Sequence, residues 1–84
     1  MILDLIKKIE FFLNLESKNP NKNLLEGRRI QSQVHQAAAF CFPSIFKDKE
    51  SIKNIEKIAE EEQDSLSGIE NNLRSLLQKM KELN

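Results

Sequence analysis

Hydrophobic residues recur at alternating steps of three and four through the C-terminal part of the chain. The positions in this pattern are Ile52, Ile55, Ala59, Glu62, Leu66, Ile69, Leu73, Leu76, Met80 and Leu83. All of them except Glu62 are apolar, and the spacing is that of a heptad repeat whose core positions face a neighbouring helix. The repeat predicts an α-helix over about residues 48–83.

Two shorter amphipathic segments precede the repeat. A first helix is predicted over about residues 2–17 by the apolar stripe Ile2, Ile6, Ile9 and Leu13. Pro20 would end it, because proline disfavours helical backbone at the residue before it. A second helix is predicted over about residues 24–42, with Asn23 as its N-cap and Pro43 directly after its last residue. The chain is therefore expected to form a single small helical domain.

The connector between the second helix and the repeat carries two large apolar residues, Ile45 and Phe46. Loops are usually polar, so both side chains are expected to pack under the neighbouring helices. Asp48 or Ser51 is expected to cap the start of the helix that follows.

The length of the repeat raises the question of one helix or two. A single helix over residues 52–83 would be about 48 Å long, whereas a compact chain of this size is only roughly 30 Å across. The unbroken heptad phase favours an all-α fold in which a helical hairpin packs on one long C-terminal helix. The alternative is a compact antiparallel four-helix bundle broken near Ser65–Gly68, where Ser67 and Glu70 could form a capping box and Gly68 weakens the helix.

A continuous helix would extend beyond the two shorter helices and leave part of its apolar stripe in water. The residues predicted to bind a partner there are Leu66, Ile69, Leu73, Leu76, Met80 and Leu83. A second copy of the chain, with a dimer as the first expectation, or a helix of another protein would cover them. Glu62, the polar member of the repeat, could set the register or the choice of partner.

The phenylalanines supply all the aromatic side chains of the sequence. Phe11 and Phe12 are adjacent, so one of them must point away from the main stripe of its helix. Phe40, Phe42 and Phe46 cluster near the end of the second helix. A shared core is the first interpretation of these side chains, and an aromatic anchor for a partner is the second.

Charge and composition narrow the classes of partner. Lysine plus arginine and aspartate plus glutamate each number 13, so the net charge is zero. Nucleic-acid-binding domains usually carry a basic excess, and this balance argues against such a partner. The single cysteine, Cys41, cannot form an internal disulfide, which suits a reducing compartment. Since no apolar run approaches the ~20 residues of a membrane span, we expect a cytoplasmic protein without membrane contact.

Few side chains are spaced for catalysis or metal binding. His35 is the only histidine, and it lies six residues from Cys41, which matches no zinc-ligand pattern. On one helix the two would also lie about 120° apart, too far around for the imidazole to activate the thiol. The sequence therefore predicts no metal site, no cofactor and no catalytic residue.

One short motif suggests an enzyme as the alternative. Arg28 and Arg29 precede His35 by seven and six residues on the same predicted helix. This spacing resembles the Arg-x(4–6)-His motif of HEPN-type ribonucleases, which are all-α proteins that dimerise and pair two such motifs. The resemblance implies RNA cleavage by His35 with Arg28 or Arg29. Helical geometry places Arg28 on the same face as His35 and Arg29 about 120° away.

These observations favour a non-enzymatic function. The prediction is a helical protein–protein interaction module that acts through self-association or by binding a partner helix. Adaptors, secretion-type chaperones, antitoxins and inhibitors are all compatible with it. A small HEPN-like ribonuclease is the alternative prediction.

Overall fold

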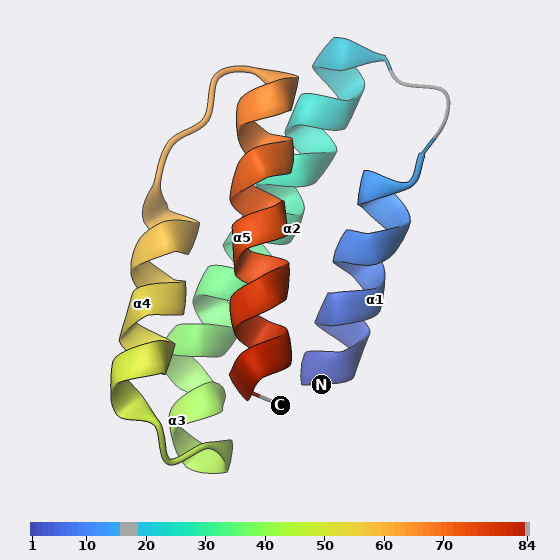
Figure 1. Cartoon of the computed structure of the whole chain (residues 1–84). Coiled ribbons are helices and arrows are strands. Elements are labelled where there is room, and N and C mark those ends of the chain that lie inside the picture. The colour runs from blue at the N-terminus through green and yellow to red at the C-terminus, as the bar shows by residue number, and fades with distance from the viewer. Residues whose placement is uncertain (16–18, 84) are drawn as a thin grey trace.

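The computed structural model describes residues 1–15 and 19–83, and every regular element in these residues is a helix. The helices are α1 (Ile2–Leu13), α2 (Pro20–Phe40), the one-turn α3 (Phe42–Ile45), α4 (Lys49–Glu60) and α5 (Leu66–Leu83). The four longer helices run alternately up and down, and α3 lies in the connection between α2 and α4 (Figure 1). The all-α prediction is confirmed.

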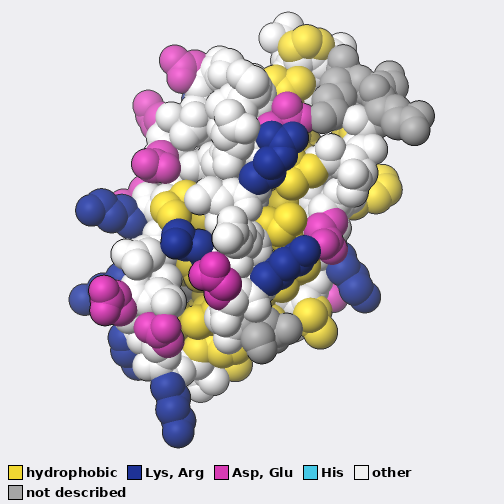
Figure 2. Space-filling view, viewed as in Figure 1, with side chains coloured by type: hydrophobic (Ala, Val, Ile, Leu, Met, Phe, Trp, Pro, Cys, Tyr) yellow, Lys and Arg dark blue, Asp and Glu magenta, His cyan; other side chains and the backbone are white. Residues whose placement is uncertain are grey.

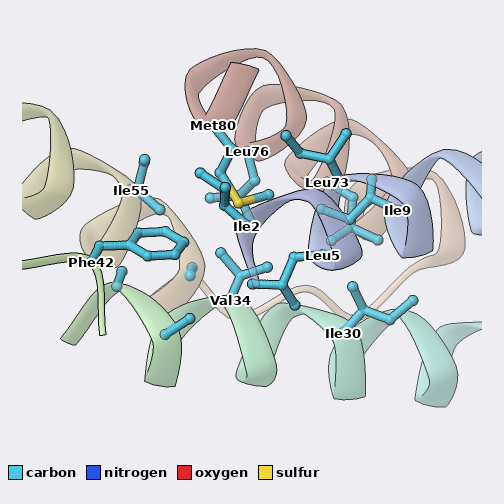
Figure 3. Close-up of a cluster of buried hydrophobic side chains, with 14 of the residues drawn as sticks. Ile2, Leu5, Ile9, Ile30, Val34, Phe42, Ile55, Leu73, Leu76 and Met80 are labelled. Atoms are coloured by element: carbon cyan, nitrogen blue, oxygen red, sulfur yellow. The ribbon is translucent and has the colours of Figure 1, made fainter. Parts of the chain in front are cut away.

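One hydrophobic core holds all five helices together. Figure 3 shows its members pointing toward one another from every helix, among them Ile2, Leu5, Ile9, Ile30, Val34, Phe42, Ile55, Leu73, Leu76 and Met80. Burying one large apolar side chain is worth about 1.5–3 kcal/mol. The shared core is therefore the main source of stability in this small chain.

The prediction of one long C-terminal helix is wrong. Helix α4 ends at Glu60, α5 begins at Leu66, and α5 runs back antiparallel to α4 (Figure 1). The alternative prediction, a four-helix bundle broken near Ser65–Gly68, matches the structure. A straight helix of about 48 Å would exceed the 38 Å long axis of the molecule. By folding back, both halves of the repeat bury their apolar stripes in the same core.

Amide side chains from two other helices complete the C-terminal end of α4, where carbonyl groups lack donors within the helix. Asn72 of α5 donates from Nδ2 to the Ile58 carbonyl oxygen at 3.0 Å. Gln31 of α2 donates from Nε2 to the Glu61 carbonyl oxygen at 2.8 Å and to Asn72 Oδ1 at 3.0 Å. Both amide side chains belong to buried residues, so the break in the repeat is stabilised by contacts from α2 and α5.

The start of α5 is capped by Ser65, two residues before the predicted Ser67. Ser65 Oγ accepts a hydrogen bond from the Gly68 backbone N–H at 3.1 Å, which satisfies one of the donors that a helix start leaves free. Glu62 lies exposed in the connector between α4 and α5. Its polar character therefore fits a solvated turn.

The boundary between α1 and α2 also differs from the prediction. Helix α1 ends at Leu13, and residues 16 and 17 of the predicted helix lie outside the described residues. Pro20 begins α2 instead of ending α1, because the first helical position needs no backbone donor and suits the fixed φ of proline. Asn19 is the N-cap, and its Oδ1 accepts from the Lys22 backbone N–H at 3.1 Å. Asn23, the predicted cap, lies inside the helix.

Helix α2 lies close to its neighbours at Gly27. A Cβ atom there would lie 2.8 Å from Ile69 Cγ1 and 3.1 Å from Phe12 Cζ. These distances are shorter than van der Waals contacts, so α1, α2 and α5 could not meet in this way around a larger residue. Ala37 and Ala38 of the same helix are buried as well.

The connector after α2 is only partly as predicted. Phe42 is fully buried, and the Phe46 ring packs edge-on against it with ring centroids 5.7 Å apart. The expectation that Ile45 is buried is wrong, since 57% of its surface is exposed. It lies at the end of α3, a turn of helix that the sequence did not predict.

Asp48 caps the start of α4, one of the two caps that the sequence allowed. Its Oδ1 accepts from the Ser51 backbone N–H at 3.0 Å, and its Oδ2 accepts from the Ser51 hydroxyl at 2.6 Å. Both bonds favour the ionised carboxylate. The Ser51 hydroxyl first, and the Ser51 backbone N–H second, hold the pKa of Asp48 below its ordinary value.

Candidate interaction groove

The residues predicted to bind a partner lie in or against the core of the bundle. They are Ile69, Leu73, Leu76 and Met80, which are fully buried, and Leu66 and Leu83, which are partly buried against the same core. The expectation that part of the apolar stripe is left in water is wrong, because α5 packs on α1, α2 and α4 of its own chain. A surface for a partner has to be found elsewhere on the molecule.

The phenylalanines divide into buried and exposed side chains. Of the three phenylalanines that the sequence offered as a second possible anchor for a partner, Phe42 is fully buried, Phe46 is partly buried, and Phe40 is 80% exposed. Of the adjacent pair in α1, Phe12 lies in the core and Phe11 is 73% exposed. Two large aromatic side chains, one on α1 and one on α2, are therefore exposed to water. Aromatic residues are enriched in the centres of protein interfaces.

Phe11 and Phe40 both border a groove between α1 and α2, which we call the α1–α2 groove. Its α1 wall repeats at steps of three and four and consists of Met1, Asp4, Lys8, Phe11 and Leu15, with core residues beneath. Its α2 wall repeats in the same way and includes Asn23, Glu26, Ile30, Gln33, Ala37 and Phe40. Residues at these spacings share one face of a helix, so the two walls face each other along the bundle.

The α1–α2 groove consists of two hollows of about 520 Å³ each. Phe11 borders the first and Phe40 the second. Lys8 borders both, and its Nζ donates to Gln33 Oε1 at 3.0 Å between the two walls. Lys8 therefore lies where the two hollows adjoin, and each hollow has an exposed aromatic side chain beside it.

Asn23 lines the first hollow and is only 8% exposed. Its Nδ2 has no hydrogen-bond partner among residues 1–15 and 19–83, although a buried donor without a partner costs about 1–3 kcal/mol. Buried polar groups in folded proteins are nearly always paired. The Asn23 amide is therefore a buried donor that the described part of the chain leaves without a partner.

The charges along the α1–α2 groove are balanced. Lys8 and Lys22 contribute positive charge, and Asp4 and Glu26 contribute negative charge. A strongly basic or acidic partner would gain little from such a surface. The groove is suited instead to a partner with apolar groups and mixed charges.

The other side of α1 is different in character. In Figure 2 hydrophobic side chains are visible between α1 and α5, and charged side chains lie over them. One bridge between these helices is the ion pair of Lys81 Nζ with Glu10 Oε2 at 3.0 Å. Charged groups thus lie across that seam, while the α1–α2 groove is bordered by exposed phenylalanines.

The structure brings Arg28, but not Arg29, beside His35. Arg28 and His35 border a hollow of about 230 Å³ between α2 and α4, in agreement with their seven-residue spacing. The Arg29 side chain is 72% exposed and forms a surface ion pair with Glu26 at 3.8 Å. Whether Arg28 and His35 act on RNA stays a prediction.

His35 lies close to two carboxylates of α4. Its Nε2 is 3.0 Å from Glu60 Oε1, and the tautomer protonated at Nε2 donates this hydrogen bond. One possible ligand atom from each of His35, Glu56 and Glu60 lies within 4.8 Å of the others. An imidazole and two carboxylates are ligands that can bind a divalent transition metal. Sequence spacing missed this group because its members come from two helices.

The α1–α2 groove was not predicted either, although the sequence held a signal for it. Asp4, Lys8, Phe11 and Leu15 follow steps of four, three and four beside the main stripe of α1. Two of the four are charged, so this second stripe does not stand out in a hydrophobic pattern. The exposure of Phe11 follows only once Phe12 is placed in the core.

Two further observations bear on the class of protein. None of the helices among the described residues is both long and apolar enough to cross a membrane. Comparisons of the chain with protein-family models, with curated proteins and with solved structures find no match, so a functional assignment has to rest on the geometry of the molecule itself.

Proposed function

We propose that this protein is a non-enzymatic helical interaction module that self-associates through the α1–α2 groove. The observation that carries the proposal is the exposure of Phe11 and Phe40, 73% and 80%, beside the two hollows of one groove. An aromatic side chain can bury about 150–250 Å², and buried aromatic anchors supply much of the energy of protein interfaces.

A second copy of the chain suits this groove for reasons of symmetry. A two-fold dimer uses the same patch on both subunits, so every contact occurs twice. The groove offers an anchor and a hollow on the same face, and Phe40 of each copy could enter the hollow beside Phe11 of the other. The patch is thus able to complement itself.

Charge supports the same occupant. The groove carries Lys8 and Lys22 together with Asp4 and Glu26, so two copies bring matching numbers of opposite charges together. The net charge of the chain is zero, and the two copies do not repel each other overall.

The proposal is tested by sedimentation velocity over a range of concentrations. The wild-type chain is expected to form a dimer at tens of micromolar. The double variant Phe11→Ser/Phe40→Ser should dissociate at concentrations at least tenfold higher, because it lacks both anchors. Its far-UV circular dichroism should stay that of the wild type, since neither side chain lies in the core.

Leu25→Ser is the matched control. Leu25 is 66% exposed on α2 but does not border the groove, so its replacement should leave the dimer unchanged. A wild-type chain that stays monomeric at 100 µM, or a dimer weakened as much by Leu25→Ser as by the double variant, would overturn the proposal.

A further inference from the structure

We propose that His35, Glu56 and Glu60 form a binding site for a divalent transition metal, with Zn²⁺ as the ion that it fits best. The three side chains meet where α2 packs against α4, away from the α1–α2 groove. The proposal does not depend on self-association, because all three ligands belong to one chain.

The distances suit a single ion. Zinc lies 2.0–2.1 Å from nitrogen and oxygen ligands in a tetrahedral site, so its ligand atoms are about 3.3 Å apart. His35 Nε2 and Glu60 Oε1 are already 3.0 Å apart. The ligand atom of Glu56 lies within 4.8 Å of both, a gap that rotation of a glutamate side chain can close.

The backbone fixes the three positions before any ion binds. Glu56 and Glu60 are four residues apart on α4, so their side chains lie on one face of that helix. His35 lies well inside α2, which packs more extensively on α4 than on any other helix. Only side-chain rotation is needed to assemble the ligands, and this keeps the entropy cost of binding low.

The local charges favour a cation, with one group opposing it. Glu56 is partly buried and forms no hydrogen bond or ion pair with the described residues, and it lies close to the second carboxylate, Glu60. A divalent ion would relieve the repulsion between the two. Arg28 borders the same hollow and opposes the ion. The hollow, about 230 Å³ in volume, leaves room for water as a fourth ligand.

The donor set selects the class of metal. Magnesium and calcium prefer oxygen ligands alone, whereas zinc readily accepts one imidazole nitrogen beside carboxylates. Zinc would bind His35 Nε2 in the tautomer that carries its proton on Nδ1. The ion therefore takes the place of the proton that Nε2 shares with Glu60.

Isothermal titration of the untagged Cys41→Ser chain with Zn²⁺ tests this site, because the substitution removes the thiol as a competing ligand. One ion per chain is expected to bind, and an equal concentration of Mg²⁺ should give no binding. His35→Gln, Glu56→Gln and Glu60→Gln should each weaken the affinity at least tenfold. Glu82→Gln, a surface carboxylate on α5, should leave it unchanged.

Cobalt provides a second, spectroscopic readout that does not depend on the heat of binding. Bound Co²⁺ should give the visible absorption bands of a four-coordinate site in the Cys41→Ser chain and lose them in His35→Gln. Far-UV circular dichroism should show the same helix content in all variants. Absence of Zn²⁺ binding at 100 µM, or equal binding by Glu82→Gln and the three ligand variants, would overturn the site.

Discussion

Gln31 Nε2 of α2 donates a hydrogen bond to Asn72 Oδ1 of α5 at 3.0 Å, in the interior of the bundle. The same Gln31 group reaches the Glu61 carbonyl oxygen, and Asn72 Nδ2 reaches the Ile58 carbonyl oxygen. Two helices thus supply donors to the end of a third. The turn between α4 and α5 is held by residues that are distant from it in sequence.

Asn72→Ala should lower the free energy of unfolding by about 1–3 kcal/mol, because the Gln31 amide and the Ile58 carbonyl each lose a hydrogen bond in the interior. Asn71→Ala is the matched control. Asn71 is an exposed neighbour whose side chain accepts a surface hydrogen bond from Arg74, and its loss should cost less than about 0.5 kcal/mol. Urea unfolding followed by circular dichroism measures both, and equal losses would show that the Asn72 contacts contribute nothing.

These amide contacts explain why the sequence predicted the wrong C-terminal helix. Each half of the repeat needs an apolar stripe at steps of three and four to face the core, whether or not the halves are joined. When the connector between the halves has a length that keeps the three-and-four spacing in phase, the two stripes look like the stripe of one continuous helix. The sequence held signs of a break in the length of the repeat and in Gly68. The contacts of Gln31 and Asn72 that hold the turn depend on the tertiary fold and have no local signal.

Gly27→Ala is expected to destabilise the chain, since its Cβ would lie 2.8 Å from Ile69 Cγ1. Overpacking of this kind costs about 1–3 kcal/mol, which outweighs a gain of up to about 1 kcal/mol in helix propensity. Gly68→Ala should cost less than Gly27→Ala. Its closest contact would be the end of the Gln63 side chain, which can move away, and the capping Ser65 Oγ at 3.0 Å would have to shift by only a few tenths of an ångström. Thermal unfolding of both variants provides the comparison. A more stable Gly27→Ala chain would mean that the helices are not packed so closely there.

Phe42 and Phe40 provide a test of the division between core and groove. Phe42→Ala removes a fully buried ring and should lower the free energy of unfolding by about 3–5 kcal/mol. Phe40→Ala changes an exposed ring and should shift the stability of the monomer by less than about 0.5 kcal/mol. Both are measured by urea unfolding at concentrations low enough to exclude association. Similar losses for the two would place Phe40 in the core.

The Asp48 cap should make stability depend on pH. The pKa of Asp48 is lowered in the folded chain, so its stabilising effect is complete above the unfolded pKa of about 3.9 and is lost as the pH falls through the folded pKa. The thermal midpoint of Asp48→Asn should lie below that of the wild type at pH 7, and the gap should close in acid. Other carboxylates titrate in both proteins and cancel in the difference. A gap that stays constant down to pH 2 would exclude the ionised cap.

The parts of the fold that the sequence did predict share a physical basis. The stripe of Ile2, Ile6 and Ile9 predicted α1 because burial of an apolar face decides where a helix lies. The end of α1 was misplaced because Pro20 suits the first turn of a helix as well as the region after one. The α1–α2 groove and the His35 cluster depend on which helices become neighbours. The hydrophobic pattern of the sequence does not show which helices these are.

The chain folds back between α4 and α5 and buries its own heptad residues. Spin labels at Glu50→Cys and Gln78→Cys, in a Cys41→Ser background diluted with unlabelled protein, report this distance by pulsed electron resonance. Both positions are exposed. In the antiparallel pair the labels should lie roughly 10–20 Å apart, since packed helices are about 8–10 Å apart. A distribution centred near 40 Å, the length that one continuous helix gives between these residues at about 1.5 Å per residue, would contradict the fold.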